Sequence, residues 1–186
     1  CTASIVVDSS DPDGVAAFEI GFADLAGNVG TNVTSSTDSS SVTIDTTVPT
    51  LSPVAISSDP SPAGVGSVIT VNFTASEPLD NSTTVTIAGL VASPVTCVGL
   101  VCTASIVVSD ANTEGNVSVV ISYTDTAGNA GVPATTTTDG SSVTIDTTQP
   151  TLEPVTISSS RTPDPAGIGS VITINFTASE PLLLGT

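Results

Sequence analysis

The chain has 186 residues, of which 18 are acidic, one (Arg161) is basic and none is histidine, so its formal net charge is -17. Such a charge repels phosphate backbones and anionic lipids, and we therefore expect no nucleic acid and no membrane insertion. Without histidine or lysine the usual general bases of nucleophilic catalysis are missing, so we expect no enzyme activity.

The sequence is internally repeated. Cys1–Asp45 returns as Cys102–Asp146, 101 residues later, with 23 of 45 positions identical. Thr46–Leu79 returns as Thr147–Leu182, with two extra residues near Arg161. A repeat of this length has the size of a whole small domain.

The repeat divides the chain into three parts. Residues 1–45 form the C-terminal half of one repeat, residues 46–146 form a complete repeat, and residues 147–186 form the N-terminal half of the next. The sequence opens and closes within a repeat, which indicates a segment of a longer tandem protein.

Short alternating runs predict strands throughout. In the first part, Val15, Ala16, Phe18, Ile20 and Phe22 occupy the region that corresponds to the predicted strand Val117–Thr124. In the complete repeat the predicted strands are, in chain order, Pro53–Ser57, Val68–Ser76, Thr83–Ala88, Val91–Cys97, Cys102–Val108, Val117–Thr124 and Ser141–Ile145. About seven short strands per repeat of roughly 101 residues, without helical periodicity, predict an all-β chain of tandem antiparallel β-sandwiches.

Alternation also predicts which side chains enter the core. In the run Val68–Ser76, four residues face one way, namely Ile69, Val71, Phe73 and Ala75, and Thr70, Asn72 and Thr74 face the other. Further along the repeat, the predicted core positions are Val117, Val119, Ile121 and Tyr123.

Cys97 and Cys102 are separated by four residues between two strand-like runs. A hairpin would bring their Cα atoms close to the distance that a disulfide prefers, and such a bridge indicates an oxidising, extracellular compartment. A metal pair is the alternative, but two cysteines without further Cys or His do not make a zinc site. Cys1 is the repeat counterpart of Cys102.

Two motifs resemble those of bacterial immunoglobulin-like repeats. The phrase SVTIDTTVPTL, Ser41–Leu51, recurs as SVTIDTTQPTL, Ser142–Leu152, and the turn DTAGN spans Asp125–Asn129. The resemblance covers the whole chain and implies immunoglobulin-like sandwiches of the kind that build the stalks of large adhesins and other surface proteins. Most such repeats lack the cysteine pair.

The resemblance also implies Ca²⁺ at the junctions between repeats, bound by carboxylate, amide and carbonyl oxygens. The matching residues are Asp24, Asn28, Asp45 and Glu77 at the first junction, and Asp125, Asn129, Asp146 and Glu180 at the second. A second interpretation stays open: Asp125 and Asn129 only shape a tight turn, with Gly128 at positive φ, and Asp146 is a solvated strand end.

Five Asn-X-Ser/Thr sequons occur, at Asn32, Asn72, Asn81, Asn116 and Asn175. They are either N-glycosylation sites or the chance product of a chain rich in Ser, Thr and Asn. The Thr135–Thr138 run is interpreted as a polar loop.

Together these features predict a structural segment of a large secreted or cell-surface protein that forms an extended stalk or fibre, with neighbouring repeats as its partners. A second hypothesis is a self-assembling extracellular filament or sheath, in which other copies of the chain supply a domain or strand. A carbohydrate- or ice-binding module is a weaker third hypothesis, because it should show an aromatic patch or a flat Thr ladder.

Overall fold

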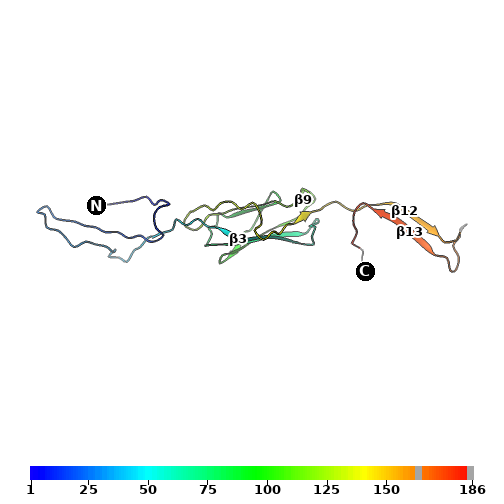
Figure 1. Cartoon of the computed structure of the whole chain (residues 1–186), viewed down its shortest axis with the longest axis horizontal. Helices are drawn as coiled ribbons and strands as arrows, with labels where there is room; N and C mark the ends of the chain where they lie inside the picture. The colour runs from blue at the N-terminus through cyan, green and yellow to red at the C-terminus, as the bar shows by residue number, and fades with distance from the viewer. Residues whose placement is uncertain (162–164, 184–186) are drawn as a thin grey trace. The chain divides into compact units, whose positions relative to one another are not determined.

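The computed structural model describes residues 1–161 and 165–183. All regular structure in these residues is β-strand, so the predicted all-β class is confirmed, and they contain no helix long and apolar enough to cross a membrane. The chain forms two compact units, Cys1–Asp146 and Thr147–Thr186. Figure 1 shows β3 within the first unit and β12 and β13 within the second.

The larger sheet of the complete repeat has four antiparallel strands in the order β3-β4-β8-β7. Its strands are β3 (Leu51–Asp59), β4 (Val68–Ala75), β8 (Val101–Val107) and β7 (Thr96–Val98). The central strand β4 pairs with β3 along one edge and with β8 along the other. One face of this sheet is buried, because the inward residues of β4 and β8 alternate with exposed ones.

A second antiparallel sheet has the order β10-β5-β6. It consists of β5 (Thr84–Ile87), β6 (Leu90–Ala92) and β10 (Val119–Ser122). A short pair formed by β9 (Gly115–Asn116) and β11 (Thr144–Ile145) completes the repeat.

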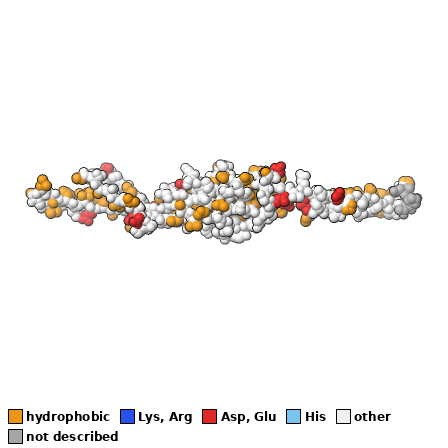
Figure 2. Space-filling model, turned by 90° about the horizontal axis from the view of Figure 1, so that it is seen from above, with side chains coloured by type: hydrophobic (Ala, Val, Ile, Leu, Met, Phe, Trp, Pro, Cys, Tyr) orange, Lys and Arg blue, Asp and Glu red, His pale blue; other side chains and the backbone are white. Residues whose placement is uncertain are grey.

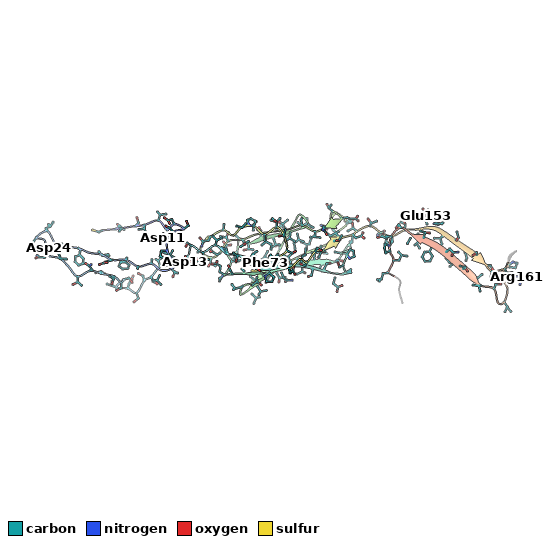
Figure 3. The ribbon with its side chains drawn as sticks, viewed as in Figure 1. Asp11, Asp13, Asp24, Phe73, Glu153 and Arg161 are labelled. Atoms are coloured by element: carbon teal, nitrogen blue, oxygen red, sulfur yellow. A yellow bond between two sulfur atoms is a disulfide. The ribbon has the colours of Figure 1, made fainter. Side chains whose placement is uncertain are left out.

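One hydrophobic core lies between these sheets. Residues of both contribute to it, and the side chain of Phe73 lies within it (Figure 3). The largest fully buried hydrophobic side chains are those of Phe73, Ile69, Ile87, Ile121, Ile145, Val54, Val71, Val85, Val108 and Val143. Each such side chain stabilises the fold by about 1.5–3 kcal/mol relative to an exposed one. The predicted inward faces of Val68–Ser76 and Val117–Thr124 are confirmed, although Val117 is only partly buried.

Three predicted strands differ from those observed, and one of them, Val117–Thr124, is shortened to β10. The run Val91–Cys97 is not one strand: β6 and β7 divide it at Ser93 and Pro94, and they belong to different sheets. Proline cannot donate a ladder hydrogen bond, so it marks the change of sheet. The run Ser141–Ile145 is also shorter than predicted, because only β11 pairs within it.

The predicted disulfide between Cys97 and Cys102 is present. The two residues are cross-strand partners in the β7–β8 hairpin, one pair away from the turn at Gly99 and Leu100. Cys102 is buried in the core, whereas Cys97 is exposed.

Residues 1–45 form a long ribbon with few paired strands. Here β1 (Gly14–Val15) pairs with β2 (Thr43–Ile44), and single bridges join Ile20 to Val33 and Ala23 to Val29. The side chains of this region are exposed except for Ala16, which is partly buried; Phe18 and Phe22 are exposed at 43% and 54%. These residues belong to a partial repeat, and within residues 1–45 no second sheet covers them.

The second unit is a strand pair, β12 (Leu152–Ser159) with β13 (Ile172–Ala178). Its register repeats that of β3 with β4, including the irregularity between Leu152 and Val155. Its apolar side chains are exposed as well, among them Ile157 and Phe176. Hydrophobic side chains are accordingly visible on the surface of both the ribbon and this strand pair (Figure 2).

Candidate metal site

The linker between the ribbon and the complete repeat, Asp45–Thr50, is hydrogen-bonded to the ribbon through Asp13. The Oδ1 atom of Asp13 accepts the Thr46 N–H at 2.6 Å and the Thr46 hydroxyl at 2.8 Å. Its Oδ2 atom accepts the hydroxyl of Thr47. These three contacts lower the pKa of Asp13, the Thr47 hydroxyl contributing most. The start of the linker is thus held by one ionised carboxylate.

The complete repeat holds the linker from the other side. The Asn129 side-chain amide donates to the backbone carbonyl of Asp45 at 3.0 Å. Further along, Thr50 and Ser76 exchange two hydrogen bonds, of 3.0 Å and 2.9 Å, and the preceding residue, Pro49, is fully buried. The linker is therefore part of the structure rather than a free tether.

Asn129 is positioned by the turn Asp125–Asn129. Hydrogen bonds between the residues of this turn stabilise it. The Oδ1 atom of Asp125 accepts the N–H groups of Ala127, Gly128 and Asn129 at 2.7–2.9 Å, and its Oδ2 atom accepts the Asn129 amide at 2.8 Å. Gly128 has φ +100°, a conformation that residues with a Cβ rarely adopt. This part of the turn-only interpretation is confirmed.

The same turn also brings Asp125 to two other carboxylates. Asp45, Glu77 and Asp125 each offer an oxygen, and these oxygens lie within 4.8 Å of one another. Glu77 follows β4, and the bridge between Leu79 and Asp125 holds its segment against the turn. Asp45 reaches the cluster because Asn129 binds its carbonyl. The three residues thus come from the linker, the end of β4 and the turn.

The cluster concentrates negative charge without a basic side chain to balance it. The only basic residue of the chain, Arg161, belongs to the second unit. Two ionised carboxylates at this separation repel each other by about 3 kcal/mol at an effective dielectric constant of about 20. The arrangement therefore favours either a proton or a bound cation.

Glu77 is the carboxyl group that resists ionisation. Burial raises its pKa above the ordinary value, and the negative charges of Asp45, Asp125 and Asp13 raise it further. Its Oε1 atom is buried, and none of the described residues donates a hydrogen bond to it. A buried oxygen without a partner is costly, so this atom fits a hard cation as ligand.

Asp125 behaves in the opposite way. Burial by itself would raise its pKa, since only 1% of the residue is exposed. The hydrogen bonds from Asn129, Gly128 and Ala127 together outweigh burial and lower the pKa. Asp125 therefore stays ionised and supplies a permanent negative charge.

The grouping of the predicted ligands differs from the observed one. Asp24 and Asn28 do not join Asp45 and Glu77; they bond to each other in a turn of their own, at 2.7 Å. This turn closes the ribbon beyond the bridge between Ala23 and Val29, whereas Asp13 and the linker lie at the other end (Figure 3). The turn Asp125–Asn129 therefore faces the linker that precedes its own repeat, and Asp125 takes the place predicted for Asp24.

The remaining predicted ligands are divided between the units. Asp146 ends the first unit, where its N–H donates to the Ala63 carbonyl at 3.0 Å. Glu180 lies in the second unit and repeats the feature of Glu77, a buried Oε1 atom without a hydrogen-bond donor among the described residues. The ligand roles of Asp146 and Glu180 stay predictions.

Sequence reasoning missed Asp13, which holds the linker. A signal was available: Asp13-Gly14 recurs as Glu114-Gly115 at the repeat offset, and both glycines have positive φ. An acidic residue kept before such a glycine indicates a specific role.

All five sequon asparagines are exposed in the structure. On β4, the side chain of Asn72 accepts a hydrogen bond from the Thr103 hydroxyl at 2.8 Å on the outer face of the sheet. Glycosylation of these residues stays a prediction.

Comparisons of the chain with known protein families, with curated proteins and with solved structures found no match.

Proposed function

We propose that this chain is a structural segment of a large secreted or cell-surface protein, in which tandem immunoglobulin-like β-sandwiches form an extended extracellular stalk or fibre. The repeated sequence supports this, as does a complete repeat that folds around its own core between two antiparallel sheets. The Cys97–Cys102 disulfide supports an oxidising environment. In such an array each sandwich acts as a spacer and the linkers determine the stiffness.

The linker carries this proposal. It is hydrogen-bonded to the ribbon by Asp13 and to the complete repeat by Asn129, and Pro49 of the linker is fully buried. Ordering a linker costs conformational entropy, which a flexible tether would not need to lose. A linker bound from both sides transmits force and limits bending, which is what a stalk requires.

Calcium at the junction is part of the proposal. Asp45, Glu77 and Asp125 would hold the ion, with backbone carbonyls completing the six to eight oxygen ligands that Ca²⁺ takes. The bound ion would neutralise the cluster and tie the linker to the end of β4 and to the turn. The buried Oε1 of Glu77 is the observation that favours a cation over solvent.

The test is calorimetry and small-angle scattering of the whole chain, in millimolar Ca²⁺ and then with a chelator. At a Ca²⁺ concentration ten times Kd, binding should add about 1.4 kcal/mol to the free energy of unfolding, seen as a rise in Tm of several degrees. Glu77→Gln should abolish this rise, because it removes a ligand charge while keeping the shape of the side chain.

Asp139→Asn is the matched control, since Asp139 is an exposed aspartate in a turn of the same repeat. It should keep the full response to calcium. If neither Tm nor the scattering of the wild-type chain responds to Ca²⁺, the calcium assignment is wrong, and the stiffness of the linker must come from its hydrogen bonds alone.

A second candidate function is a filament that assembles from copies of this chain. The exposed apolar surfaces of the ribbon and of the β12–β13 pair favour it. Patches of this kind on a soluble protein commonly mark surfaces that contact another molecule.

A further inference from the structure

One edge of the larger sheet of the complete repeat is closed by a loop, residues 138–141, which lies along β3. Thr138 donates its N–H to the Val54 carbonyl at 2.9 Å, and its hydroxyl accepts the Val54 N–H at 2.8 Å. The Ser141 hydroxyl accepts the N–H of Ile56 at 2.8 Å. The backbone groups that an edge strand leaves unpaired are thus bonded within the repeat on this side.

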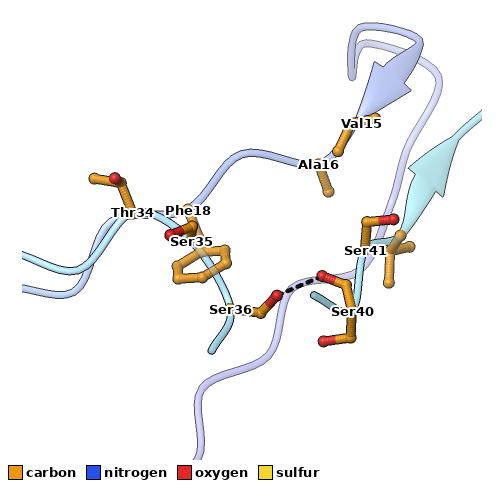
Figure 4. A pocket seen from close by; sticks show the side chains of 9 residues that line it. Val15, Ala16, Phe18, Thr34, Ser35, Ser36, Ser40 and Ser41 are labelled. Atoms are coloured by element: carbon orange, nitrogen blue, oxygen red, sulfur yellow. Dashed lines mark hydrogen bonds between the residues drawn. The ribbon is translucent and has the colours of Figure 1, made fainter. Parts of the chain in front are cut away.

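This covering loop takes its shape from its own residues. The Thr137 hydroxyl donates to the Ser141 carbonyl at 2.8 Å. At the same positions of the repeat in the ribbon, the Ser36 hydroxyl donates to the Ser40 carbonyl at 2.7 Å (Figure 4). Protection of the β3 edge is therefore a local feature of the repeat sequence.

The opposite edge of the same sheet, β7, is open. It is the last strand in the order, and all three of its residues are exposed. Ala75 donates its N–H to the Leu100 carbonyl, so alternation along β8 directs the N–H and C=O of Cys102 towards β4 as well. The backbone groups of its partner Cys97 therefore point away from β8, where no strand of the described residues pairs with them.

The open edge lies in the longest uncharged stretch of the chain. Residues 81–109, which include β5 to β8, contain none of the 18 acidic residues and not Arg161. Soluble proteins commonly protect an edge strand with charged side chains, whereas β7 carries Val98, which is 80% exposed opposite Val101. On a chain of net charge -17, this edge is where a second copy meets the least repulsion.

The disulfide holds this edge in place. A strand of three residues has few bonds to its neighbour, and the Cys97–Cys102 bridge ties β7 to β8 at its middle residue. Because the bridge keeps β7 extended, the strand loses little conformational entropy when another strand pairs with it.

We propose that β7 is a lateral contact between two copies of this chain, in which the two β7 strands pair antiparallel about a two-fold axis through Cys97. The strand is complementary to itself. Cys97 of each copy donates its N–H to the Cys97 carbonyl of the other, and Thr96 lies opposite Val98. This isologous contact joins two four-stranded sheets into one continuous sheet.

Repetition makes so short a contact useful. A three-residue strand offers few hydrogen bonds, so a single contact is weak. In the proposed tandem array the edge recurs at the repeat spacing, and a second array presents it at the same spacing, so the contacts reinforce one another. A partner of another kind lacks this match. The inference concerns how neighbouring stalks associate, which goes beyond the stalk itself and is independent of calcium.

Amide hydrogen exchange of the whole chain, followed by NMR, tests the proposal in chelator and at about 0.5 M salt, where the Debye length is only a few ångströms. The Cys97 amide should exchange at least about threefold more slowly when the protein concentration is raised about a hundredfold, because pairing supplies its acceptor. Val98→Asp should remove this dependence, since it places two negative charges at the contact. Val132→Asp is the matched control: Val132 is 78% exposed in a loop of the same repeat, so the dependence should remain.

A mixture of isotope-labelled and unlabelled chains tests the register. Nuclear Overhauser effects between copies should connect Thr96 of one copy with Val98 of the other, because residues opposite each other in a strand pair have their Cβ atoms about 5 Å apart. Their absence in a sample whose Cys97 amide is protected would overturn the two-fold pairing.

Three further results would overturn the proposal. The first is a Cys97 exchange rate that is the same at both concentrations, and the second is an equal response of the two variants. The third is association that leaves the Cys97 amide unprotected, which would place the contact elsewhere on the chain, for example on the ribbon or the β12–β13 pair. A calcium response and a stiff linker can survive any of these results, so this failure is distinct from that of the proposed function.

Discussion

Two carboxyl groups of one cluster have their pKa values moved in opposite directions. Asp125 is more deeply buried than Glu77, yet its pKa is lowered while that of Glu77 is raised. The difference lies in hydrogen bonds. Three backbone N–H groups and the Asn129 side-chain amide donate hydrogen bonds to the Asp125 carboxylate, whereas the Oε1 atom of Glu77 has no donor among the described residues. Local hydrogen bonding thus decides which carboxylate carries charge at neutral pH.

The raised pKa of Glu77 predicts how stability depends on pH in the absence of calcium. A carboxyl group whose pKa is raised by folding stabilises the fold fully below its ordinary value of 4.5, and this contribution is lost as the pH rises through the raised pKa. In chelator, Glu77→Gln should therefore be more stable than wild type at pH 7 and equal to it below pH 4.5.

Chemical denaturation between about pH 4 and pH 7 measures this difference. Asp110→Asn, which removes an exposed carboxylate from a loop of the same repeat, should not show it. In saturating Ca²⁺ the order at pH 7 should reverse, because only wild type keeps the ligand. A constant difference between Glu77→Gln and wild type at every pH would contradict the assignment.

At the scale of the element, an aromatic ring packs on a glycine close to each Asp-X-Ala-Gly-Asn turn, once in the ribbon and once in the complete repeat. A Cβ added to Gly131 would lie 2.1 Å from the Tyr123 ring, and one added to Gly30 would lie 2.2 Å from the Phe22 ring. The ring covers the strand next to the Asp-X-Ala-Gly-Asn turn in both cases. Glycine is needed here for close approach, because neither residue has a positive φ.

Gly131→Ala should therefore destabilise the complete repeat by about 1–3 kcal/mol, the usual cost of overpacking. Gly64→Ala is the control, because its added Cβ would find its nearest neighbour, the Asp146 carbonyl, at 3.7 Å. Urea denaturation of the two variants measures the difference. An unchanged free energy of unfolding in Gly131→Ala would show that the ring does not rest on this glycine in solution.

At the scale of the whole molecule, stability and stiffness reside in different places. The buried core consists of side chains from residues 54–145, and the ribbon contributes none of them. The contacts of the linker lie outside that core and involve Asp13 on one side and Asn129 on the other. A change at the linker should therefore alter the connection without altering the Tm of the repeat.

Asp13→Ala separates these two properties. Hydrogen exchange at the Thr46 amide should become faster by roughly fivefold or more, because its acceptor is lost, while the Tm of the complete repeat stays unchanged. Asp11→Ala is the control, since the Asp11 carboxylate bonds to the Asp8 N–H and not to the linker. Equal exchange rates in both variants would mean that Asp13 does not hold the linker.

Much of the complete repeat could be predicted from its sequence. The alternation of apolar and polar residues placed Ile69, Val71 and Phe73 in the core, because successive side chains of a strand point to opposite faces of the sheet. The cysteine pair was predictable because a hairpin with a two-residue turn brings its strands together at a known spacing. The Asp125–Asn129 turn was predictable because the hydrogen bonds that shape it, those accepted by the Asp125 carboxylate, are local.

The sequence by itself therefore determined the features that neighbouring residues decide: strand faces, the disulfide hairpin and the shape of each turn. Only the tertiary structure decided which segments meet. The order of the strands places the turn at Asp125 next to the linker that precedes the same repeat. Asp45 and Glu77 therefore lie beside Asp125 and not beside Asp24. It also decided the burial of Val119, because that side chain is covered only when the two sheets of the complete repeat pack together.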